Sequence, residues 1–155
     1  NGTNAVSQGV EVYAQHTLSF GLGFQANFTY NSTSMTDVTL GGQKVGNSPL
    51  VGSARTQVNG SVFYENSFLL LRASYNRRGE LVNGIVSGLN YYSDPFQQID
   101  LNASWYVLQN LSINGSVINL TRSEDRQHLG NDTTARFYAS TYGGRILYLG
   151  ANFKF

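Results

Sequence analysis

Two histidines are the first candidates for chemistry in this sequence, which contains no cysteine. His16 lies beside a short turn and His128 lies in a long connection. A hydrolase of the Ser-His-Asn type would need a histidine in the middle of a strand, with serine and asparagine on neighbouring strands. A metal site would need several clustered ligands, and the sequence spaces none together. We therefore predict no catalytic residue, no metal, no cofactor and no enzyme.

Basic and aromatic pairs are the second group of candidates. Arg77 and Arg78, followed by Glu80, could hold an anionic ligand, although a wet rim that binds phosphate or water is the alternative. Tyr91 and Tyr92 could stack on a sugar or a catechol, although ordinary loop aromatics are the alternative. These four are the predicted ligand-binding residues. The net charge of +1 gives no electrostatic case for nucleic acid.

The last thirteen residues, 143–155, show which kind of element positions these side chains. Apolar and polar residues alternate there without a break, and a period of two predicts a strand rather than a helix. Leu147, Leu149, Ala151, Phe153 and Phe155 share one face. The closing strand therefore has one apolar and one polar side, and it ends on an aromatic residue.

Six further runs alternate in the same way, at residues 9–18, 22–31, 55–65, 68–77, 96–107 and 111–120. Each is close to the ~9–11 residues that a tilted strand needs to cross a bilayer. Short turns alternate with long connections at 32–54, 78–95 and 121–142. Short turns on one side and long loops on the other are typical of outer-membrane β-barrels. The pattern predicts an all-β, antiparallel transmembrane barrel.

Charge and aromatic patterning agree with this prediction. Only 12% of the residues are charged, against ~25% in ordinary soluble domains, and the apolar faces contain almost no charge, with Arg145 at a loop end as an exception. An Arg or Lys on a lipid-facing surface at mid-bilayer would cost ~2–4 kcal/mol. We expect Glu65, Arg72, Asp100 and Lys154 to form hydrogen-bonded networks in the lumen. Aromatic residues near the run ends fit interfacial girdles, and His16 fits an interfacial position.

Seven strands do not make a closed barrel, because single-chain bacterial barrels have even strand numbers. Unpaired edges in lipid would also leave backbone groups unsatisfied. We therefore expect residues 1–155 to be the C-terminal section of a larger barrel, unless residues 1–8 or 121–142 hide an eighth strand. A small self-closed pore or structural barrel is one alternative. A soluble β-sandwich binding module is another, in which Leu22, Leu69, Leu101 and Leu147 would be buried together.

An ordered set of short motifs makes the prediction more specific. The motifs are Gly9-Val10-Glu11, Asn47-Ser48-Pro49-Leu50, Tyr64-Glu65-Asn66, Leu71-Arg72-Ala73-Ser74-Tyr75-Asn76-Arg77, Asp100-Leu101-Asn102-Ala103-Ser104-Trp105, Asn119-Leu120-Thr121, and Gly144-Arg145 with Leu149-Gly150 and a terminal Phe155. Together they resemble the C-terminal third of TonB-dependent outer-membrane receptors. The chain is similar in character to the large receptor group of Xanthomonas- and Caulobacter-like bacteria.

This resemblance implies a barrel of about 22 strands, plugged by an N-terminal domain, in the outer membrane of a Gram-negative bacterium. Such receptors import a scarce solute, such as a siderophore, cobalamin or an oligosaccharide, with energy from the TonB complex. We expect these 155 residues to contain neither the plug nor the TonB-contacting segment. The implied partners are outer-membrane lipid, lipopolysaccharide, the rest of the receptor and the barrel-assembly machinery. That machinery is expected to read a closing-strand signal at Tyr148, Phe153 and Phe155.

Overall fold

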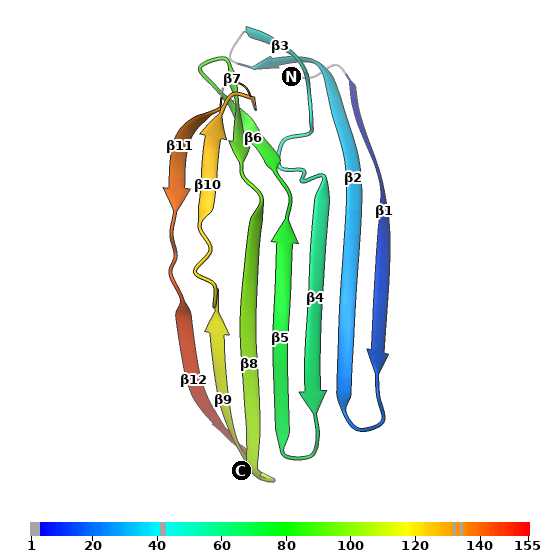
Figure 1. Ribbon diagram of the computed structural model, residues 1–155, viewed down its shortest axis with the longest axis vertical. Helices are drawn as coiled ribbons and strands as arrows, with labels where there is room; N and C mark the ends of the chain where they lie inside the picture. Colours follow the sequence, from blue (N-terminus) through cyan, green and yellow to red (C-terminus); the bar gives the residue numbers. More distant parts are fainter. Residues whose placement is uncertain (1–3, 41–42, 132, 134) are drawn as a thin grey trace.

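Antiparallel β-strands joined by turns and loops form the computed structural model, which describes residues 4–40, 43–131, 133 and 135–155 (Figure 1). Seven strands lie side by side in the order β1-β2-β4-β5-β8-β9-β12, and we call them, with β3, the wall sheet. Their bounds are β1 Asn4–Thr17, β2 Leu22–Leu40, β4 Thr56–Glu65, β5 Leu69–Arg78, β8 Phe96–Leu108, β9 Leu111–Ile118 and β12 Ile146–Phe153. The short β3, Gln43–Ser48, pairs only with β2. No helix among the described residues is long and apolar enough to cross a membrane.

The seven strands of the wall sheet correspond to the seven alternating runs of the sequence, so the predicted all-β antiparallel fold is confirmed. The first two strands are longer than predicted. β1 begins at Asn4, β2 continues to Leu40, and Asn4 is paired with Thr36. The apolar alternation stops near Asn31, but the backbone ladder does not, because hydrogen-bonded pairing needs no apolar face. The hairpin therefore extends well beyond the apolar part of the wall.

The apolar face of the wall sheet is uncovered. Leu22, Leu101 and Leu147 are 37%, 36% and 71% exposed, and Leu69 is half-buried. The pairing register places Leu71, Ala103 and Leu149 in one row across the sheet, together with Tyr64 and Gly115. These side chains are not gathered in a compact interior. The alternative of a soluble β-sandwich is therefore wrong, because a sandwich buries this face against a second sheet.

The wall sheet is open at both edges in the part of the chain that the structure describes. β1 pairs only with β2, and β12 pairs only with β9. Residues 4–8 lengthen β1, and the strands found in the third long connection join a different sheet. Among their described residues, 4–8, 121–131, 133 and 135–142, neither of these two segments supplies the eighth wall strand that a small self-closed barrel would require.

A second sheet of four strands lies beyond one end of the wall, and we call it the rim sheet. It has the order β11-β10-β7-β6, with β6 Leu81–Val86, β7 Leu89–Ser93, β10 Asp125–Leu129 and β11 Arg136–Thr141. Each of its strands adjoins one wall strand along the chain, so the rim sheet continues the line of β5, β8, β9 and β12 (Figure 1). The predicted long connections at 78–95 and 121–142 thus contain hairpins.

The β6–β7 hairpin follows from its turn residues. Ser87 and Gly88 have φ values of 51° and 77°, and two successive positive φ angles are the signature of a type I′ turn. Next to this hairpin lies the small buried core. Val82 is 1% exposed, Ala54 and Ser93 are 4% exposed, and the Gly52 amide donates to the Val82 carbonyl at 2.8 Å. The best-packed part of the chain is therefore at the rim, where the segment before β4 lies against β6.

Candidate functional site

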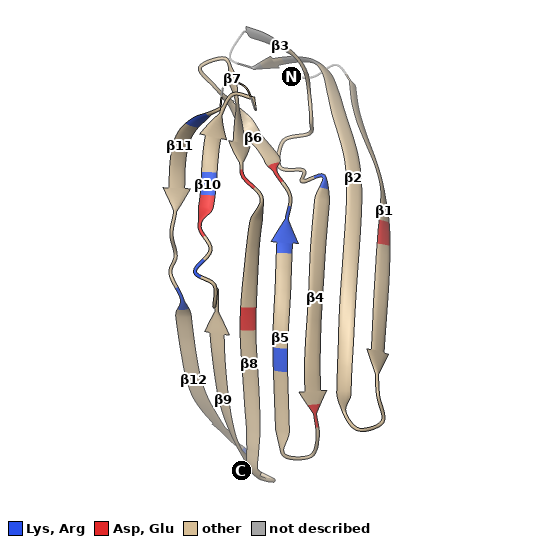
Figure 2. Cartoon of the chain, viewed as in Figure 1, with Lys and Arg blue, Asp and Glu red and all other residues tan. Residues whose placement is uncertain are grey.

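Charged residues gather where the wall sheet meets the rim sheet, and Figure 2 shows how few of them lie along the wall strands. At this level, single backbone hydrogen bonds extend the β4–β5 and β8–β9 ladders past their last paired residues. The Gly79 amide donates to Thr56, and the Leu120 amide donates to Ile99, each at 2.8 Å. A Cβ atom at Gly79 would lie 2.7 Å from the Thr56 hydroxyl. The chain can leave β5 at this point because glycine has no side chain.

A cavity of about 470 Å³ opens at this junction. Its walls come from the upper part of β2, the segment before β4, the end of β5, β6 and the β7–β8 connection. The lining residues are Asn31, Ser32, Thr33, Pro49, Ser53, Arg55, Thr56, Arg77, Gly79, Glu80, Leu81, Val82, Tyr92 and Pro95. Two guanidinium groups, one carboxylate and one aromatic ring therefore share a cavity that has many hydroxyl and amide groups. Such a lining can orient a polar or anionic solute by hydrogen bonds and stacking.

Of the four predicted ligand-binding residues, the structure brings two to this cavity. Arg77 and Tyr92 line it. Arg78 instead donates to Asp125 at 3.2 Å, and the Tyr91 hydroxyl donates to Gln127 at 2.6 Å. The latter two side chains are thus engaged in contacts between strands. A role in ligand binding stays a prediction for all four.

Arg55 is the lining residue that the sequence reasoning missed. It precedes β4 and is the first residue of the alternating run 55–65. Its guanidinium carbon lies 5.8 Å from the centre of the Tyr30 ring. The only available signal was its position at the loop end of a run, next to a long connection. Alternation alone could not show that this connection folds back against β6.

Asn119 is the polar centre of the β9–β10 connection. It is 7% exposed and has a φ of 55°. Its amide nitrogen Nδ2 donates to the carbonyls of Ser123 and Gly144 at 3.0 and 2.9 Å, and its Oδ1 accepts from the Ser123 amide at 2.8 Å. Its backbone amide donates to Asp100 at 2.9 Å. One side chain therefore ties the end of β9 to the chain entering β12.

The four charged residues predicted to form lumen networks all lie on the polar face of the wall. Asp100 accepts from Asn119 and from the Gln98 side chain at 2.8 Å, and the Arg72 guanidinium lies 5.1 Å from the centre of the Phe63 ring. Glu65 and Lys154 are exposed. Among the described residues, the carboxylates within ion-pair distance of a basic group are Asp125, next to Arg78, and Asp94, next to His128, so these four residues do not pair with one another. The lumen network stays a prediction.

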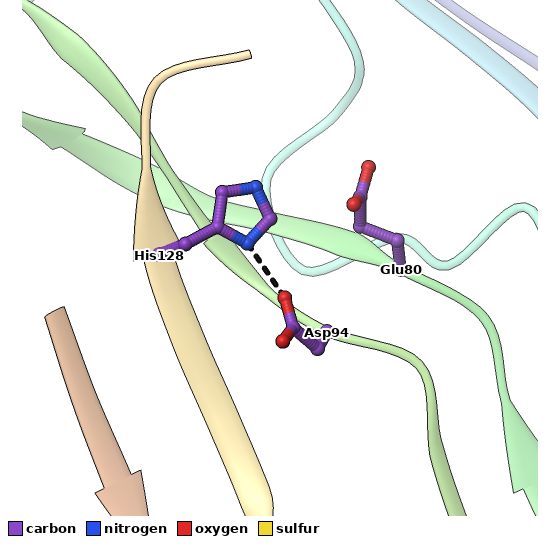
Figure 3. Close-up of side chains that lie close together, drawn as sticks. All are labelled: Glu80, Asp94 and His128. Atoms are coloured by element: carbon purple, nitrogen blue, oxygen red, sulfur yellow. Dashed lines mark hydrogen bonds and ion pairs between the residues drawn. The ribbon is translucent and has the colours of Figure 1, made fainter. Parts of the chain in front are cut away.

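Three potential metal ligands converge at the junction, as Figure 3 shows. Ligand atoms of Glu80, Asp94 and His128 all lie within 4.8 Å of one another. His128 Nδ1 and Asp94 Oδ1 are 2.6 Å apart, and the His128 ring stacks on Tyr92 with centres 5.0 Å apart and 14° between planes. The spacing of these residues in the sequence does not indicate this cluster, and the predicted absence of a metal stays a prediction.

The convergence has a topological cause. β7 and β10 are neighbours in the rim sheet, and His128 is paired with Tyr92. Asp94 follows β7, and Glu80 precedes β6. His16 lies at the other end of the wall, with its ring centre 6.3 Å from that of Phe24. Only the pairing of strands far apart in the sequence could have shown which histidine meets the carboxylates.

Comparison with protein families identifies the chain. The family model for the TonB-dependent receptor-like β-barrel matches residues 1–120. The chain belongs to this family. The family consists of outer-membrane receptors and transporters of Gram-negative bacteria, not of enzymes. Comparison with curated proteins and with solved structures gave no significant match.

The predicted membership of the TonB-dependent receptor family is therefore confirmed, whereas the Xanthomonas- and Caulobacter-like group stays a prediction. The family match ends at residue 120, whereas the wall sheet continues beyond it with β12. β12 pairs with β9 over eight consecutive residues, from Ile146–Ile118 to Phe153–Leu111. The closing strand thus extends the same antiparallel wall. Its proposed assembly residues Tyr148 and Phe153 are exposed, and the Phe153 ring meets the Phe155 ring edge-on at 5.3 Å.

Proposed function

We propose that this chain forms part of the wall and part of the rim of an outer-membrane receptor. The receptor takes up a scarce solute, such as a siderophore or an oligosaccharide, with energy from the TonB complex. The family match carries this proposal. The structure adds a wall with an exposed apolar face and a polar cavity at the end where the long connections lie. In barrels of this type the long loops face the outside of the cell. The cavity would therefore be open to solute arriving from outside the cell.

Arg77, Arg55 and Tyr92 are the side chains that we propose as solute contacts. They line one cavity and come from three different strands or strand ends. Two cationic groups suit a solute with carboxylate, catecholate or phosphate oxygens, and the Tyr92 ring suits a flat or sugar-like surface. The side chains of Arg78 and Tyr91 are hydrogen-bonded to side chains of β10. We therefore propose that these two residues support the cavity, while the other three contact the solute.

The remaining partners follow from the same proposal. The free edges of β1 and β12 would pair with the rest of the receptor barrel, because an unpaired edge in lipid leaves backbone groups unsatisfied. The plug and the TonB complex would act through other parts of the receptor. Lipopolysaccharide phosphate would meet basic side chains near the rim, and the barrel-assembly machinery would read Tyr148, Phe153 and Phe155.

Uptake by cells that express the receptor containing this chain tests the proposal. Uptake of labelled ferric siderophores and oligosaccharides is compared in cells with and without TonB. We expect saturable uptake of one class that is lost without TonB. Saturable uptake that persists without TonB would contradict energised transport and indicate a passive pore.

Matched variants then test the cavity. For R77A and Y92A we expect the half-saturating solute concentration to rise about tenfold, which corresponds to the loss of one strong contact. The controls are R136A and Y142A, which change exposed residues at the edge strand β11 and just beyond it. An equal effect of the cavity variants and their controls would exclude the cavity as the solute site.

A further inference from the structure

We propose that Glu80, Asp94 and His128 form a binding site for a divalent transition-metal ion, with Zn²⁺ as the best fit. The three residues come from three separate places at the junction of the two sheets. Glu80 lies between β5 and β6, Asp94 lies between β7 and β8, and His128 lies within β10. Their donor atoms are nevertheless within 4.8 Å of one another (Figure 3).

The spacing of the donors suits an ion after a small adjustment, in which His128 and Asp94 move slightly apart and Glu80 moves closer. Zinc binds imidazole nitrogen and carboxylate oxygen at ~2.0–2.2 Å, so tetrahedral ligands of one ion stand about 3.3 Å apart. His128 Nδ1 and Asp94 Oδ1 are 2.6 Å apart because they share a hydrogen bond, and an ion would take the place of the shared proton. Three protein ligands leave one position open for water or another ligand.

The electrostatics of the cluster also favour a cation. Neither Glu80 nor Asp94 is paired with a lysine or arginine among the described residues, where Arg78 pairs with Asp125. The neighbouring Arg126 has its guanidinium carbon 6.0 Å from the centre of the Phe137 ring. Two carboxylates thus approach one imidazole without a basic side chain bound to either. A divalent ion would neutralise both, which is the role of metals in clustered carboxylate sites.

Two of the three ligands are held in place by the rim sheet. The His128 ring stacks on Tyr92, and the Asp94 backbone amide donates to Arg126 at 2.8 Å. The Ser93 side chain before it is buried and accepts from Asn83 at 2.6 Å. Glu80 is exposed and is the ligand free to close on the ion. Binding would therefore fasten the β5–β6 connection to the β7–β10 pair.

The donor set selects the class of metal. Calcium and magnesium are hard cations that prefer oxygen ligands, and magnesium also gives up its bound water reluctantly. One imidazole with two carboxylates suits zinc and neighbouring first-row ions.

The test uses the whole receptor that contains this chain, purified in detergent and stripped of metal. ZnCl₂ is titrated by calorimetry, and Co²⁺ is added separately because its visible absorption reports imidazole coordination. We expect Zn²⁺ binding at the wild-type site to disappear in H128A and to weaken at least about tenfold in E80Q. The control is H16A, which removes the other histidine of the chain, at the far end of the wall, and should leave binding unchanged.

E80Q keeps the test decisive if H128A disturbs the rim, because the Glu80 side chain is exposed and has no ion pair with the residues that the structure describes. Zinc affinity that is unchanged in both variants, or an absence of zinc binding to the wild type, would overturn the proposal. Tighter binding of Ca²⁺ than of Zn²⁺ would overturn the assigned metal class. None of these results depends on solute uptake, so this inference and the proposed transport function can fail separately.

Discussion

Phe63 on β4 lies against Gly23 on β2, so closely that a Cβ atom at Gly23 would stand 2.4 Å from the tip of the Phe63 ring. The two residues are directly paired, and Phe63 is paired on its other side with Arg72. The Phe63 ring is 9% exposed, although it lies on the polar face of the wall. A glycine, an aromatic ring and a guanidinium group therefore form one row across three strands.

The first prediction follows from this row. G23A should destabilise the folded receptor by about 1–3 kcal/mol, because the added methyl group displaces the Phe63 ring. G60A is the matched control, since a Cβ atom there would meet its nearest neighbour at 3.8 Å. Urea unfolding of both variants in lipid vesicles measures the difference. Equal midpoints for G23A and G60A would show that the ring moves away without cost.

The second prediction concerns the apolar face. L101R should destabilise the receptor in a bilayer by ~2–4 kcal/mol, because it places a charge where hydrocarbon is expected. S74R is the control at the same height, since Ser74 is paired with Asp100 on the opposite face. The amount of heat-modifiable, folded receptor in outer-membrane fractions measures both effects. Normal assembly of L101R together with failure of S74R would reverse the assignment of the faces.

The wall could be predicted from the sequence because its side chains repeat with a period of two. Leu101 and its alternate neighbours face one side, and Asp100 and its alternate neighbours face the other, so each strand is visible by itself. The predicted strand bounds were wrong where the alternation of apolar and polar residues stopped. β2 continues through a stretch rich in serine and threonine, in which pairing with β1 replaces apolar burial as the signal.

The rim and its metal ligands could not be predicted in the same way. β10 is the short segment Asp125–Leu129, with four polar residues before Leu129, and nothing in it marks one face. Its strand character comes from β7 and β11 on either side. Without that pairing, His128 remains 34 residues from Asp94 in the sequence. Side chains that meet only through non-local strand pairing leave no local pattern.

The third prediction concerns the Arg78–Asp125 ion pair, which joins the end of β5 to the start of β10. Its side chains are 27% and 38% exposed, so solvent screening leaves it worth only about 0.2–1 kcal/mol. A double-mutant cycle of R78A, D125A and the combined variant, followed by urea unfolding, isolates that coupling. The coupling should shrink in high salt. A coupling of several kcal/mol, independent of salt, would mean that the pair is shielded from water in the assembled barrel.

The fourth prediction separates the two roles of Asn119, which are its hydrogen bonds and its backbone conformation. N119G keeps a residue that accepts the φ of 55° but leaves the carbonyls of Ser123 and Gly144 without their donor, at a cost of about 1–3 kcal/mol. N119A loses the same bonds and should cost about 1–2 kcal/mol more, because a Cβ atom disfavours this left-handed conformation. Urea unfolding ranks the variants, and protease cleavage between β9 and β12 should increase in the same order. If N119A were as stable as N119G, the connection would have shifted to a right-handed conformation, and the tie between β9 and β12 would not depend on this residue's geometry.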